Sequence, residues 1–142
     1  MRRGFALLLT FAALALAECA GSAKRESAAL IGAVDRYRRA DNASKAGLVE
    51  SISGVACTDA QVCDAKQACL AAIEPTARAL RLKDEVTLRL SDIEHKRLAL
   101  DEPEAQALPD KLDEATRLLT EGRAKMADCE KKLTDLRLEH GV

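Results

Sequence analysis

The last third of the chain carries the pattern that most restricts its fold. Apolar or small residues recur there at alternating steps of four and three: Leu108, Leu112, Ala115, Leu119, Gly122, Met126, Cys129, Leu133 and Leu136. This heptad spacing keeps one narrow stripe of a helix against a partner helix. It predicts a long helix over about 109–139. Pro109 fits its first turn, where the missing N–H would have no helical partner.

A second apolar stripe precedes this segment and predicts the partner helix. It runs from Ala79 to Leu100 in steps of three and four residues. Asp101-Glu102-Pro103 then predicts a turn, because proline disfavours helix in the residue before it. Such a short connection leaves an antiparallel hairpin as the arrangement that buries both stripes. We therefore expect helices over about 76–100 and 109–139 to form the frame of the molecule.

An N-terminal helix is predicted over about 25–53, where apolar positions also follow helical spacing. Asp41 and Asn42 weaken its middle, so the pattern allows either one long helix with a soft centre or two shorter helices. Gly54 follows Ser53 and is a plausible stop.

Another helix is predicted over about 59–73. Thr58 and Gln61 have the spacing of a capping box, which places the start of the helix near Asp59. Pro75 cannot donate to a carbonyl four residues earlier, so the helix is expected to kink or restart there. We expect this helix and the N-terminal one to pack across the hairpin.

Aromatic residues are almost absent from the chain after its N-terminal segment. Phe5 and Phe11 both lie in that segment, which leaves Tyr37 as the one aromatic residue of the remainder. A core of Ala, Leu, Val and Ile suits close helix packing and suits sheets poorly. The sequence therefore predicts an all-α fold, with residues 25–142 as a single helical domain.

The N-terminal segment has the pattern of a cleaved secretory signal. Arg2 and Arg3 precede fourteen uncharged, mostly apolar residues, and Ala15 and Ala17 stand at the small-residue positions that a signal peptidase reads. Fourteen residues span about 21 Å as a helix, too short for a hydrocarbon core of ~30 Å. We expect cleavage after Ala17, with 1–17 as signal peptide and 18–24 as a flexible lead-in. The protein would then be periplasmic or secreted.

Cys19 supports an alternative fate for the mature N-terminus. Leu16-Ala17-Glu18-Cys19 resembles a bacterial lipobox, in which the cysteine becomes acylated and anchors the protein to a membrane. Glu18 departs from that pattern, because a small residue is expected immediately before the cysteine. Lipidation at Cys19 is therefore the alternative to a free chain that begins at Glu18.

The other four cysteines lie within the expected helical domain. In an exported protein they predict two disulfides. Cys63 and Cys69 lie about 9 Å apart along a helix axis, which is beyond disulfide reach. We prefer Cys57–Cys63 with Cys69–Cys129, and the runner-up is Cys57–Cys69 with Cys63–Cys129. On the chain-entropy model the long Cys69–Cys129 bridge adds roughly 3–4 kcal/mol.

Metal and catalytic sites are not expected. The cysteine spacing lacks the close pair of a zinc site, and neither His95 nor His140 has a second His or Cys within a helical turn. His95 stands among charged residues and is expected on the surface. No nucleophile–base pair and no glycine-rich phosphate loop is present in the sequence. We expect no cofactor and no enzymatic activity.

Charge also disfavours a nucleic-acid partner. The formal net charge is −1, and about −3 after loss of Arg2 and Arg3, with both signs interspersed. The basic run Arg36-Tyr37-Arg38-Arg39 is short and follows Asp35, so it is typical of a solvated helix face.

These features predict an exported, non-enzymatic helical protein that acts as a structural or protein-interaction module, binding a protein partner or itself through helix faces. The regular 108–136 stripe motivates this hypothesis. Two alternatives are a lipid-anchored envelope protein and a small helical periplasmic chaperone or stress sensor. Leu119-Thr120 and Leu133-Thr134 begin a motif of such chaperones, but Arg123 and Arg137 replace its glutamine.

Overall fold

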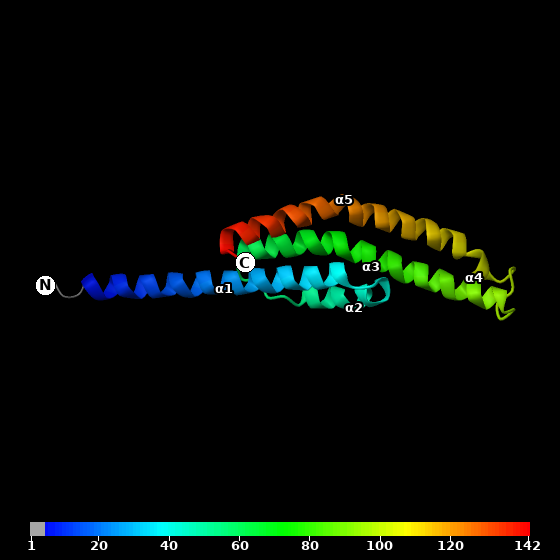
Figure 1. Ribbon diagram of the computed structural model, residues 1–142, viewed down its shortest axis with the longest axis horizontal. Helices are drawn as coiled ribbons and strands as arrows, with labels where there is room; N and C mark the ends of the chain where they lie inside the picture. The colour runs from blue at the N-terminus through cyan, green and yellow to red at the C-terminus, as the bar shows by residue number, and fades with distance from the viewer. Residues whose placement is uncertain (1–4) are drawn as a thin grey trace.

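The protein is all-α, as predicted. The computed structural model describes the backbone of residues 5–142 and the side chains of residues 21–142. No strand occurs in that part of the chain. Five helices follow one another (Figure 1): α1 Phe5–Arg39, α2 Asn42–Ser53, α3 Ala60–Glu94, α4 Pro103–Gln106 and α5 Leu108–His140.

The long helices α3 and α5 form the predicted antiparallel hairpin and lie side by side along most of the molecule (Figure 1). α1 and α2 pack against the half of the hairpin that contains the start of α3 and the end of α5. The other half extends beyond α1 and α2 and consists of α3, α5 and the short helix α4 in their connection. We call this part the arm; it comprises residues 77–94 of α3, the connection 95–107, and residues 108–122 of α5.

Two groups of buried side chains match this division. The larger joins all four long helices and includes Leu30 and Val34 of α1, Ile52 of α2, Ile73 of α3 and Leu133 of α5. The smaller contains Ala79, Ala115 and Leu118, which come from α3 and α5 alone. The arm is therefore held together by one narrow helix–helix seam, whereas the bundle half has a core shared by four helices.

The N-terminal region forms two helices, the second of the two arrangements that the sequence allowed. α1 ends at Arg39, and α2 begins at Asn42 with Asp41 as its N-cap. The Asp41 carboxylate accepts a 2.8 Å hydrogen bond from the Ser44 N–H, which lowers the pKa of Asp41 below its usual range. Asp41, which weakens a continuous helix through this region, thus also caps the start of α2.

The segment 18–24, predicted as a flexible lead-in, lies within α1 instead. Ala23 is already buried, so packing against the bundle begins before residue 25 and extends the helix toward the N-terminus. The side chains of the predicted signal peptide, the cleavage position after Ala17 and the Cys19 side chain lie outside the described residues.

Of the kink or restart expected at Pro75, the restart does not occur, because α3 runs unbroken from Ala60 to Glu94. Pro75 has no N–H to donate to the Ala71 carbonyl. Because Ala71 is exposed, water can donate a hydrogen bond to that oxygen instead. The segment 59–73 consequently belongs to the hairpin itself. It does not pack across the hairpin as a separate element.

α3 also ends earlier than the predicted residue 100. Lys96 adopts a left-handed conformation with φ of 57°, and the Arg97 N–H donates back to the Asp92 carbonyl at 2.8 Å. The Arg97 guanidinium holds the Asp92 carboxylate at 2.8 Å and lowers the pKa of Asp92. Leu98 is then buried in the turn. No glycine or proline marks this stop, and Leu98 and Leu100 extend the helical pattern in the sequence.

Gly122 allows the two hairpin helices to approach closely. A Cβ atom at this position would lie 2.6 Å from the Ala72 carbonyl oxygen and would overlap the Thr76 hydroxyl. The glycine that interrupts the apolar stripe of α5 therefore faces the turn of α3 that contains Pro75. Its lack of a side chain sets the separation of α3 and α5 where the bundle half meets the arm.

Candidate functional site

Two disulfides link the bundle half, and their pairing is the one preferred from the sequence. Cys57 bonds Cys63 with a Cα–Cα distance of 5.0 Å, and Cys69 bonds Cys129 with a Cα–Cα distance of 4.5 Å. The Cys69–Cys129 bond is fully buried in the core and staples α3 to α5. The Cys57–Cys63 bond is half-buried and ties the segment between α2 and α3, residues 54–59, to the first turn of α3.

Glu26 of α1 is the main polar anchor of this segment. Its carboxylate accepts hydrogen bonds of 2.7 Å from the Thr58 N–H and 2.7 Å from the Thr58 hydroxyl, and a longer one from the Asp59 N–H. Only 9% of Glu26 is exposed. The bonds from Thr58 hold the pKa of the Glu26 carboxyl below its usual range. Sequence reasoning missed this residue, because its partners lie more than thirty positions away.

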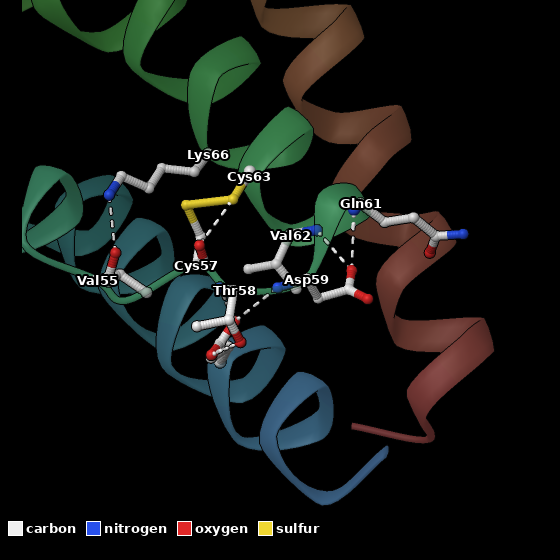
Figure 2. The surroundings of a disulfide bond; sticks show 9 residues. Val55, Cys57, Thr58, Asp59, Gln61, Val62, Cys63 and Lys66 are labelled. Atoms are coloured by element: carbon white, nitrogen blue, oxygen red, sulfur yellow. Dashed lines mark hydrogen bonds between the residues drawn. A yellow bond between two sulfur atoms is a disulfide. The ribbon is translucent and has the colours of Figure 1, made fainter. Parts of the chain in front are cut away.

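The start of α3 corrects the predicted capping box. Asp59, and not Thr58, is the N-cap, since its carboxylate accepts the N–H groups of Gln61 and Val62 (Figure 2). The Thr58 hydroxyl is instead committed to Glu26. Figure 2 also shows Lys66 reaching across the disulfide to the segment before it, where its ammonium donates to the Val55 carbonyl at 2.7 Å.

Most residues of the predicted heptad stripe of α5 are buried inside the molecule. Its members Leu108, Ala115, Gly122, Cys129, Leu133 and Leu136 are buried, and Leu119 and Met126 are half-buried. Leu112 alone is exposed, at 41%. The stripe therefore forms the seam with α3 and does not offer a free helix face, which removes the original reason to expect association through it.

Exposed leucines occur mainly on the arm. Six large apolar side chains are exposed among residues 21–142, and four of them belong to the arm: Leu88, Leu90, Leu100 and Leu112. Leu88 is 59% exposed and Leu100 is 73% exposed. α1 and α2 do not contribute to the buried cluster of the arm. This half of the hairpin thus presents apolar surface that the rest of the chain leaves uncovered.

A groove of about 590 Å³ lies where α2 meets the arm. Val49 of α2 and Pro75 of α3 line it together with the buried Leu118 of α5. Its charged residues balance in number: Arg78, Arg81, Arg117, Glu50, Glu74 and Glu121. Arg117 is held by Glu114 at 2.8 Å, so much of this charge is already paired within the protein. The groove consequently offers no strong field for an anion or a cation.

The described residues contain no cluster of three or more His, Cys, Asp or Glu side chains suited to a metal ion. His95 is exposed, as predicted, and caps the C-terminal end of α3; its ring Nδ1 lies 2.7 Å from the Ser91 carbonyl oxygen. His140 lies at the end of α5, at the other end of the hairpin.

No protein-family model matches the chain, and neither a curated protein nor a solved structure resembles it significantly. Within the part of the chain whose side chains are described, no helix is long and apolar enough to span a membrane.

Proposed function

We propose that this chain is an exported, non-enzymatic helical protein that serves as a structural or protein-interaction module, with the arm as its contact surface. The N-terminal signal pattern of residues 1–17 motivates the export part. Two disulfides support it, because disulfides persist in oxidising compartments and are rare where thiols are kept reduced.

The exposed leucines of the arm carry the interaction part of the proposal. Single exposed leucines are ordinary on a protein surface, but four of the six exposed large apolar side chains among residues 21–142 gather on the arm, which the bundle leaves uncovered. Leu88, Leu90 and Leu112 stand on α3 and α5, in the part of the hairpin whose buried cluster receives no side chain from α1 or α2. A third or fourth helix from a partner would bury these side chains in the way that α1 and α2 bury the other half of the hairpin.

Site-specific cross-linking in the source organism tests this proposal. A photo-reactive residue in place of Leu88 or Leu100 should give specific cross-linked products, whereas the same residue in place of the exposed Ser51 of α2 should give far fewer. Equal or absent cross-linking at the arm positions would contradict an interaction role for the arm.

Light scattering on the purified mature protein separates self-association from a different partner. A dimer that dissociates in the Leu88→Ser/Leu90→Ser double variant would identify a second copy as the partner. Leu138→Ser is the matched control, because Leu138 is 80% exposed and lies outside the arm. A monomer together with cross-links at the arm would identify a different protein.

A further inference from the structure

We infer that the Cys57–Cys63 disulfide is a thiol–disulfide exchange site, which a dithiol reductant opens while the fold stays intact. The proposed interaction through the arm does not require this property. The site lies at the first turn of α3, whereas the arm contains the last part of that helix. Failure of one proposal therefore leaves the other untouched.

Access distinguishes the two disulfides. Exchange begins when a thiolate attacks one sulfur of the bond, so the sulfur must be reachable. Cys69 and Cys129 are both 0% exposed and lie inside the four-helix core. Cys57 and Cys63 are half-buried at the surface of the bundle half, and Cys57 lies in an irregular segment (Figure 2). A reductant can therefore attack the Cys57–Cys63 bond without opening the core.

The position of Cys63 favours its thiolate. It lies in the first turn of α3, where the aligned peptide dipoles leave a partial positive charge. Lys66 stands one turn further on, and its ammonium reaches back to Val55, two residues before Cys57. The carboxylates of Glu26 and Asp59 are each engaged by backbone N–H groups, the Asp64 carboxylate is paired with Lys132, and the Cys57 carbonyl oxygen lies 2.9 Å from Cys63 Sγ. Cys63 is therefore the better leaving group of the pair.

The exchange reaction follows from this asymmetry. One thiolate of the dithiol attacks Cys57 Sγ, the S–S electron pair leaves on Cys63 Sγ, and a mixed disulfide forms at Cys57. The second thiolate of the dithiol then attacks the dithiol sulfur that is bonded to Cys57 Sγ. This step releases Cys57 as a thiolate. Two electrons and two protons pass to the protein, and the reductant becomes a cyclic disulfide. The reverse sequence restores the Cys57–Cys63 bond.

The segment between α2 and α3 keeps its position without this bond. Glu26 holds Thr58 and Asp59 through three hydrogen bonds, Asp59 caps α3, and Lys66 binds Val55. The buried Cys69–Cys129 bond continues to join α3 to α5. Cys57 and Cys63 thus stay close together after reduction and can form the bond again.

Titration of the oxidised mature protein with dithiothreitol tests the inference. Differential alkylation and peptide mass spectrometry report each cysteine pair, and far-ultraviolet circular dichroism reports helix content. We expect Cys57–Cys63 to be half-reduced at a dithiothreitol concentration roughly tenfold or more below that for Cys69–Cys129, with helix content unchanged. Joint reduction of both pairs together with loss of helix, or earlier reduction of Cys69–Cys129, would overturn it.

A lysine variant tests the electrostatic part separately. In the reduced protein, Lys66→Gln should slow alkylation of Cys63 by iodoacetamide several-fold near neutral pH, because the thiolate fraction falls. Lys83→Gln is the matched control, since Lys83 is an exposed lysine of the arm. Equal rates in the two variants would contradict the role assigned to Lys66.

Discussion

Glu26 connects two segments that lie 32 residues apart in the chain. The carboxylate of one helix thereby holds the segment that leads into another, and its charge strengthens each hydrogen bond it accepts. The same bonds lower the pKa of Glu26 from its usual 4.5. A group with a depressed folded-state pKa stabilises the fold above its unfolded pKa, and this contribution is lost as the pH falls through the folded value.

Glu26→Gln should therefore lower the melting temperature by a few degrees near neutral pH, because the charge-assisted bonds to Thr58 are weakened. The difference from the unaltered protein should shrink as the pH is lowered through and below 4.5, where the native carboxyl takes up its proton. Thermal unfolding at a series of pH values measures this. A difference that stays constant from neutral to strongly acidic pH would refute the role of the charge.

Gly122 provides a second single-residue test. Alanine normally favours a helix over glycine by about 1 kcal/mol. Gly122→Ala should nevertheless destabilise the protein by about 1–3 kcal/mol, because the added Cβ meets the Ala72 carbonyl and Thr76. Gly47→Ala in α2 is the control and should stabilise by about 0.5–1 kcal/mol, since the added Cβ would meet nothing within 4 Å apart from its own helix backbone and chain neighbours. Urea denaturation of both variants measures the contrast.

At the scale of helices, the sequence pattern predicts which segments are helical better than it predicts where they begin and end. The heptad spacing predicts α5, and the residues that cap helix ends predict the boundary between α2 and α3. The end of α3 does not, since it depends on Lys96 adopting a left-handed conformation and on Arg97 folding back onto Asp92. Likewise, the continuity of α3 through Pro75 depends on the exposure of Ala71, which only the packed structure defines.

The same distinction applies to the candidate sites. Helix geometry and the positions of the apolar stripes were enough to prefer the observed cysteine pairing. Glu26 could not be identified, because its role depends on a contact between distant segments. The exposed leucines of the arm could not be identified either, since Leu88 and Leu90 resemble core residues in the sequence until the short span of α2 shows which part of the hairpin stays uncovered.

Pro75 gives a prediction for α3 as a whole. Pro75→Ala should stabilise the protein by about 1–2 kcal/mol, because it restores a backbone hydrogen bond within a continuous helix, while the more flexible unfolded chain offsets part of the gain. The free energy of unfolding in urea measures this. Destabilisation would instead show that the fit of α3 against Gly122 requires the local geometry imposed by proline.

At the scale of the whole molecule, the two disulfides constrain very different lengths of chain. Cys69–Cys129 spans 60 residues and Cys57–Cys63 spans 6. The long bridge joins the two hairpin helices inside the shared core, whereas the short one constrains only the entry to α3. Global stability should therefore depend mainly on Cys69–Cys129.

Paired alanine variants test this division. Cys69→Ala/Cys129→Ala should lower the free energy of unfolding by about 3–4 kcal/mol, and Cys57→Ala/Cys63→Ala by about 2 kcal/mol, on the chain-entropy model. Chemical denaturation of each double variant supplies the values. A larger loss on removal of the short bridge would contradict the account of how the bundle half is held.

The central claim is that this helical protein is exported and cross-linked by these two disulfides. Intact-mass spectrometry of the protein recovered from its source organism tests the claim most directly. The account predicts a chain that begins at Glu18 and gains the mass of four hydrogen atoms on reduction, with linked peptides that join Cys57 to Cys63 and Cys69 to Cys129. A chain that retains residues 1–17, or one whose four bundle cysteines are free thiols, would contradict it.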